Sequence, residues 1–234
     1  MAAVPDDCNV YRTGSSSWRF GHDDLHILHR ALFVRDAAML PVTASAEVPP
    51  RLISDVPATP AVVPEADRAA AAQQWLRWWR RMLGQAAHEV SVRRAEDPGQ
   101  DVLTRIKART IWQHEICDPP DFVSLSAAPE LRSAAVATHA AYQAWSAGPG
   151  RKSAPEHEFF PWQLVHDAAH EAAASLGRPV SDMDAVAHVL AVQGRWSYLA
   201  GAGCGVCSAA VARDPAAAGE LLLQLFVSSS PAAA

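Results

Sequence analysis

The sequence predicts a mainly α-helical protein, a helical bundle of about five or six helices with a small N-terminal β-containing segment. Three observations lead to this prediction. Hydrophobic residues recur at helical spacing in several stretches after residue 64. Aromatic and aliphatic runs flank a Gly-His-Asp-Asp tip that begins at Gly21, as they do in paired strands. Prolines are concentrated between these two regions, at Pro57, Pro60 and Pro64.

The predicted organisation has four parts. A strand or hairpin segment covers residues 1–56, and a proline-rich linker without periodicity covers 57–64. The helical bundle domain covers 65–228, and a disordered tail covers 229–234. A chain of 234 residues can bury a substantial core without disulfides or metals.

The N-terminal part contains two runs, Val10 to Phe20 and Leu25 to Arg35, that we interpret as strands joined by a short loop. A helix from His22 to Val34 is the alternative. We favour the strand because the apolar residues of this run do not segregate onto one helical side. Residues 39–53 contain three prolines and are typical of an edge strand or an extended crossing.

The first helix after the linker starts near Pro64 and has its apolar residues at a 3.6-residue period, with an arginine group opposite. Further helices are expected over 101–115, 129–145, 181–199 and 215–227. Another begins at a Ser153–Glu156 capping box or at Pro161 and ends at Gly177. Its predicted inward stripe is Trp162, Val165, Ala169, Ala173 and Leu176.

Charge and cysteine content limit the classes of partner and compartment. The net charge of −5 provides no general attraction to phosphate backbones or anionic lipid, so we expect neither nucleic acid nor a membrane as partner. Four cysteines and no signal-like start indicate a reducing compartment, so we expect a cytoplasmic protein. The abundance of alanine and arginine points to a GC-rich, bacterial genome.

His166 and His170 are the first candidate site. They stand at i and i+4 of a predicted helix, so both imidazoles face the same way and could bind one divalent ion, such as zinc. A metal site needs a further ligand. Because Asp167 follows His166 where a metalloprotease helix has glutamate, that family pattern is absent. The competing interpretation treats both histidines as polar residues at the border of the core. The candidates for this further ligand are His22, His26, His157, Glu158 and His188.

Cys204 and Cys207 form the second candidate, a Cys-Gly-Val-Cys thiol pair. A second pair would predict zinc strongly, but there is only one. We favour close packing of the surrounding small residues, and a mixed Cys/His metal site or a redox role are the alternatives.

Trp78 is the third candidate, because it falls near the edge of its helix beside Arg77 and Arg81. Indole and guanidinium groups together are typical of protein interfaces. Packing within the core, with cation–π contacts, is the competing interpretation.

These candidates lead to two functional hypotheses. The first is a cytosolic interaction or accessory protein that binds a protein partner or its own copy through Trp and Arg surfaces. The second is a helical metal-dependent enzyme, a hydrolase or oxygenase, with a His-based divalent metal site. We favour the first because the elements missing from a catalytic set outnumber those present.

Overall fold

The computed structural model describes residues 9–12, 18–23, 25–53, 56–59, 62–95, 115–148 and 159–229. Within these ranges it has six α-helices and one mixed sheet, so the mainly helical prediction with strands near the N-terminus is confirmed. In the same ranges, no helix combines the length and the apolar character that a bilayer crossing requires.

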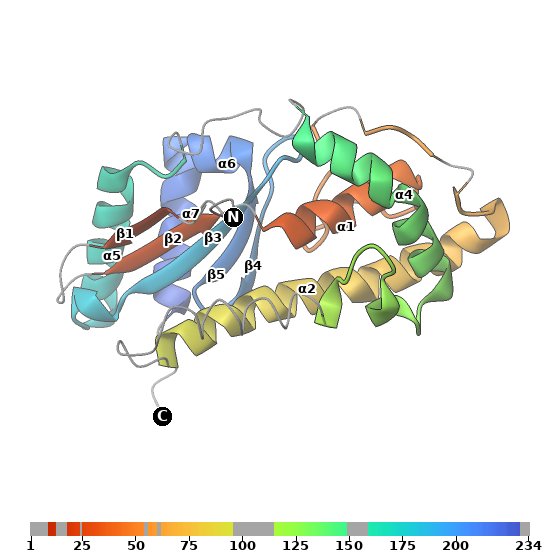
Figure 1. The fold of residues 1–234 in the computed structure, drawn as a ribbon. Coiled ribbons are helices and arrows are strands. Elements are labelled where there is room, and N and C mark those ends of the chain that lie inside the picture. Colours follow the sequence, from red (N-terminus) through yellow and green to blue (C-terminus); the bar gives the residue numbers. More distant parts are fainter. Residues whose placement is uncertain are drawn as a thin grey trace, which may run out of the picture.

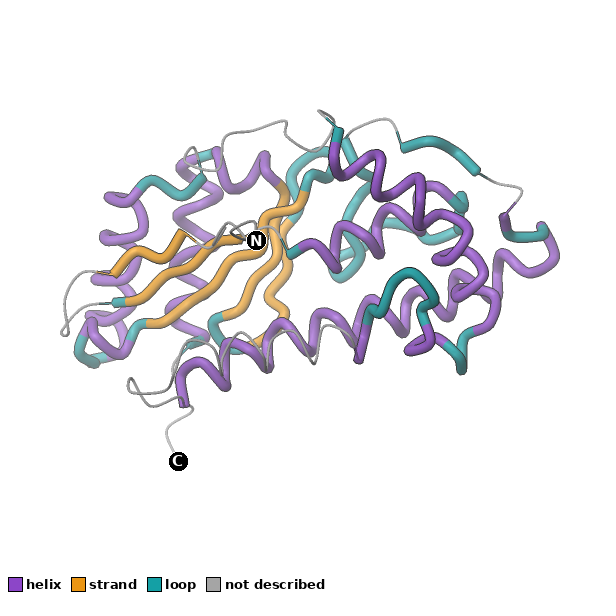
Figure 2. Tube along the Cα trace, in the orientation of Figure 1, coloured by secondary structure: helices purple, strands orange, loops and turns teal. Residues whose placement is uncertain are grey.

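The sheet has five strands in the order β1-β2-β3-β5-β4 (Figure 2). The three central strands are parallel, and the two edge strands, β1 and β4, are each antiparallel to their neighbour. The bounds are β1 Asn9–Arg12, β2 Arg19–Asp23, β3 Asp184–Leu190, β4 Ser197–Gly201 and β5 Cys204–Ser208.

The helices lie on both sides of this sheet (Figure 1). Helices α5 and α7 pack against each other on one face, whereas the long helix α2 runs below the sheet and continues to the group formed with α1 and α4 (Figure 1). The bounds are α1 His26–Ala37, α2 Arg68–Ala95, α4 Pro129–Ala147, α5 Trp162–Leu176, α6 Ala209–Arg213 and α7 Pro215–Ser228.

Two hydrophobic clusters fill the two faces. Alternate residues of β3 belong to different clusters, because successive side chains of a strand point to opposite faces. Val186 and Leu190 join the cluster of α1, α2 and α4, whereas Ala187 and Val189 join the cluster of α5 and α7. The sheet is therefore buried on both faces, as expected when crossover helices cover parallel strands.

The strand predicted for Leu25 to Arg35 is wrong, because this run forms helix α1. Only His26 and Arg30 of its twelve residues are not buried. A helix that is buried nearly all round has no polar face, so its sequence lacks the amphipathic pattern that would identify it.

The helix predicted over 181–199 is also wrong. Strand β3 and the start of β4 occupy this stretch. All seven residues of β3 are buried, and a strand that is covered on both faces shows no alternation of polar and apolar residues.

The helices expected at 129–145 and 215–227, the long helix after the linker and the one that ends at Gly177 are confirmed. The last of these begins after Pro161 rather than at Ser153, which lies outside the described residues. The helix expected over 101–115 also lies outside the described residues, except for Glu115. The predicted division of the chain into parts that end at residues 56, 64 and 228 stays a prediction. Strand β2, from the predicted N-terminal segment, pairs with β3, from the predicted helical bundle domain.

Candidate functional site

A row of rings lies along the outer side of α5. Trp162 stacks on His166, with ring centroids 4.9 Å apart and planes inclined by 18°. One turn further, the His166 and His170 rings are 4.3 Å apart. The two imidazoles therefore share one side of the helix, as their i and i+4 spacing predicts. We call Trp162, His166 and His170 the α5 ring row.

Packing of the opposite side of α5 holds the α5 ring row on the outer side of the helix. Val165, Ala169 and Ala172 are buried against α7 and the sheet, and the small alanines let the helices approach closely. Phe160 donates its backbone N–H to the carbonyl of Ala212, at 3.3 Å, just before α5 begins. Gly177 ends the helix in the left-handed conformation, with a φ of 60°. The row is thus held by a helix with well-defined ends.

Trp18 lies beside the row and fixes one of its rings. Its side chain is 1% exposed, and its indole Nε1–H donates to Nδ1 of His166 at 3.4 Å. A neutral imidazole that accepts at Nδ1 carries its proton on Nε2, so neither nitrogen of His166 offers a lone pair to a metal in this arrangement. His170 is exposed and has no such constraint from Trp18.

Of the other predicted metal ligands, the three that are described, His22, His26 and His188, do not gather around this pair. His22 is buried on β2, with its ring 6.0 Å from that of Phe160. His22 pairs with Ala187 in register, so the next residue, His188, faces the other side of the sheet. His26 is exposed at the start of α1, and His157 and Glu158 lie outside the described residues. Within the ranges described, no three His, Cys, Asp or Glu side chains are placed to hold one metal ion.

The two thiols of the Cys204–Cys207 pair lie on opposite faces of the sheet. Cys204 belongs to the cluster of α1, α2 and α4, whereas Cys207 belongs to the cluster of α5 and α7. A spacing of three residues brings side chains together on a helix and separates them on a strand. The hypothesis of a shared thiol site is therefore wrong, and the packing interpretation agrees with the complete burial of both residues.

Burial also makes Cys117 and Cys207 poor nucleophiles. It raises the pKa of Cys207 to about 12. It raises the pKa of Cys117 to about 12 as well, against the lowering effect of the Arg30 charge. Because thiolate is the reactive form, these two thiols are inert at neutral pH.

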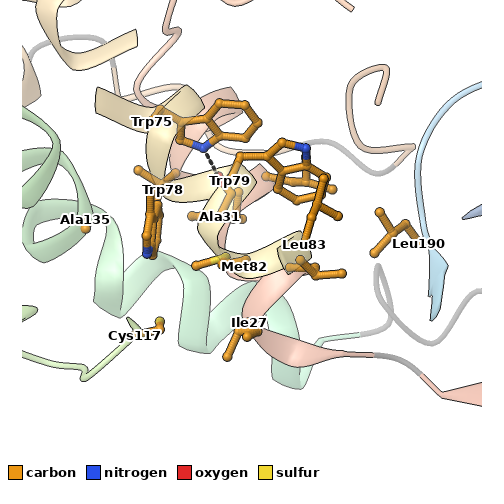
Figure 3. Close-up of a cluster of buried hydrophobic side chains, with 14 of the residues drawn as sticks. Ile27, Ala31, Trp75, Trp78, Trp79, Met82, Leu83, Cys117, Ala135 and Leu190 are labelled. Carbon is orange, nitrogen blue, oxygen red and sulfur yellow. Dashed lines mark hydrogen bonds between the residues drawn. The ribbon is translucent and has the colours of Figure 1, made fainter. Parts of the chain in front are cut away.

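Trp78 lies in the core, so the prediction that it forms an exposed interface is wrong. The residue is 4% exposed, and its Nε1–H donates to the carbonyl of Ile116 at 2.8 Å. Figure 3 shows it on α2 beside Trp75 and Trp79, facing into the buried cluster. Arg77 and Arg81 are exposed, as predicted, but the indole they were expected to accompany is not.

Trp162 is the functional candidate that sequence reasoning missed. The pattern predicted that it points inward, yet it is 41% exposed. Its place at the first residue of α5, directly after Pro161, is the signal that could have identified it, because residues 161–163 at this helix start are all exposed. The other tryptophans in the described residues are buried, namely Trp18, Trp75, Trp78, Trp79, Trp145 and Trp196.

Comparisons with protein-family models, with curated proteins and with solved structures found no match for this chain.

Proposed function

We propose that this chain is an interaction protein that binds a protein partner through the outer surface of α5. The observation that carries the proposal is the exposure of Trp162, at 41%, in a protein that buries the other tryptophans of its described residues. Tryptophan is among the residues that contribute most binding energy at protein interfaces. The sequence also favoured an interaction protein, but it placed the binding surface at Trp78. We now place that surface at Trp162.

The exposed part of Trp162 is large enough to matter energetically. An indole side chain offers on the order of 250 Å² of surface. Covering the exposed 41% at about 25 cal/mol per Å² would contribute roughly 2–3 kcal/mol to binding. Stacking on His166 already restricts the indole, so little conformational entropy would be lost when a partner covers it.

The charges beside the row indicate the chemistry of the partner. Asp167 and Glu171 are exposed on α5, and this helix contains no lysine or arginine. An identical surface would repel these carboxylates, so a symmetric dimer through α5 is disfavoured. A partner that presents lysine or arginine would pair with the carboxylates and could place a cation over the indole of Trp162.

We expect Trp162→Ala to weaken binding strongly while it leaves the fold intact. Losing 2–3 kcal/mol corresponds to roughly a 30- to 150-fold weaker complex. A photo-crosslinking residue at the exposed position Gln163 should form adducts with one protein in cells of the source organism, and these should disappear in the Trp162→Ala background. The melting temperature should change little.

The matched control is Val136→Ala, because Val136 is 45% exposed on the distant helix α4. This change should leave the adducts at position 163 intact. Adducts that persist after Trp162→Ala would contradict the proposal. Sedimentation of the purified chain tests whether the partner is a second copy of this chain, since a dimer that depends on Trp162 would show this.

A metal-dependent enzyme is the second proposal, supported by the 4.3 Å separation of the His166 and His170 rings. It requires Nδ1 of His166 to exchange its Trp18 hydrogen bond for a proton, so that Nε2 can bind a metal. It also requires a third donor. His157 and Glu158 are the predicted ligands that lie outside the described residues.

The metal proposal predicts about one zinc ion per chain after dialysis, measured by elemental analysis. His166→Ala/His170→Ala should lose that zinc, and His157→Ala should weaken its binding. His26→Ala is the control, because His26 lies on α1 rather than near α5. A wild-type chain that retains no zinc would contradict this proposal and leave the first one unaffected.

A further inference from the structure

We propose that Arg30 and His139, where α1 faces α4, bind an oxyanion, either a phosphate group or a carboxylate of a small molecule. This site is separate from the α5 ring row and does not depend on it. It is identified by a half-buried guanidinium whose contacts within the described residues are all with uncharged groups.

The contacts of Arg30 come from three aromatic rings. Its Nη1 lies 2.9 Å from Nδ1 of His139. Its guanidinium carbon lies 4.1 Å from the centroid of the Tyr142 ring and 5.9 Å from that of Phe122. Stacking on Tyr142 holds the guanidinium plane in place, as in many sites that recognise phosphate or carboxylate.

Four other arginines in the described residues have carboxylate partners, whereas Arg81 and Arg132 donate to backbone carbonyls. Arg19 pairs with Asp184 and Arg80 with Glu47, each at 3.0 Å, and the buried Arg35 pairs with Asp36 at 2.8 Å. Arg195 contacts Asp214. By contrast, no described carboxylate lies within ion-pair distance of Arg30. A charge that is partly removed from water without a counter-charge is costly, so an anion from solution would stabilise this arrangement.

Groups near Arg30 do not supply the missing negative charge. Burial keeps the Cys117 thiol protonated, since its pKa is raised to about 12. The carboxylate of Asp118 accepts hydrogen bonds from the backbone N–H groups of Val123 and Ser124 and from the Ser124 hydroxyl, and it forms no ion pair with Arg30.

His139 adds a second donor. A guanidinium cannot accept a hydrogen bond, so Nδ1 of His139 must accept and the ring carries its proton on Nε2. Burial, and then the positive charge of Arg30, lower the pKa of His139, which favours this neutral form. The Nε2–H and the remaining N–H groups of Arg30 are therefore available as donors. Arginine binds an oxyanion through charge-assisted hydrogen bonds of this kind.

The test titrates the full chain with inorganic phosphate or acetate and measures binding by calorimetry and by the melting temperature. Sodium chloride at matched ionic strength serves as the reference. We expect a saturable signal with phosphate. Arg30→Gln should weaken it by about tenfold or more, as expected for the loss of a hydrogen bond between charged groups. Acetate binding that also depends on Arg30 would extend the ligand class to carboxylates, and acetate binding alone would restrict it to them.

Two controls separate binding from folding. Arg77→Gln removes an exposed arginine of α2 and should leave the affinity unchanged. Arg30→Lys keeps the charge and most of the packing but loses the planar fork, so it should fold and still bind more weakly. The proposal is overturned if neither probe gives a saturable signal with the wild-type chain, or if Arg30→Lys and Arg30→Gln bind as tightly as wild type.

Discussion

Replacing Trp78 with alanine is expected to lower the free energy of unfolding by about 3–5 kcal/mol, the usual cost of deleting a buried indole. Trp78 is 4% exposed and lies in the cluster where α1, α2 and α4 meet (Figure 3). Its loss would open a cavity at this junction. It would also remove one of the two hydrogen bonds that the carbonyl of Ile116 accepts, at 2.8 Å, and leave the one from the Ser124 hydroxyl at 3.2 Å.

Urea denaturation of Trp78→Ala and Arg77→Ala gives the matched comparison. Arg77 is the preceding residue and is exposed, so its replacement should change stability by no more than about 0.5 kcal/mol. Trp78→Phe should fall between the two, because it keeps an aromatic ring but loses the Nε1–H donor. If Trp78→Ala costs less than about 1 kcal/mol, the indole lies at the surface, and the hypothesis that Trp78 forms a protein interface would be supported again.

Asp36→Ala is expected to cost about 3–5 kcal/mol, because it would leave the charge of Arg35 buried without its counter-charge. The two side chains join at 2.8 Å and are 3% and 6% exposed. Arg35 also donates to the carbonyls of Pro49 and Pro50, at 2.7 and 2.8 Å. Asp36 accepts the backbone N–H of Leu52 at 2.9 Å. The pair therefore fastens residues 49–52 to α1.

The loss of this fastening should be visible as faster trypsin cleavage at Arg51, which is exposed next to the attached backbone. Glu47→Ala is the control. It breaks the ion pair with Arg80, whose side chain is 59% exposed, and exposed pairs contribute only about 0–1 kcal/mol. Equal stability losses for Asp36→Ala and Glu47→Ala would show that burial of the Arg35–Asp36 pair has no energetic consequence.

The elements that were predicted correctly are those with a polar side or a clear boundary. Helix α2 has apolar residues at helical spacing opposite Arg77, Arg80 and Arg81. Helix α5 ends at Gly177, which adopts the left-handed conformation that glycine tolerates. The errors fall on α1 and β3, which are buried almost throughout. Burial on all sides removes the polar residues from which a period is recognised.

The same distinction holds for the candidate site. The shared side of His166 and His170 follows from helix geometry over one turn, so their spacing was sufficient to predict it. The Cys204–Cys207 hypothesis failed because the identity of the element, a strand, depends on its pairing with β3 and β4. The bond between Trp18 and His166 joins positions 148 residues apart, and no local pattern encodes it.

Local spacing alone was thus enough to establish a mainly helical chain, the ends of several helices and the neighbouring imidazoles of α5, because each depends on contacts within a few residues. Packing between distant segments determined the rest. It buried Trp78, exposed Trp162 and left Arg30 facing neutral rings. The exposure of a side chain depends on which other elements cover it, and those elements are brought together only when the whole chain folds.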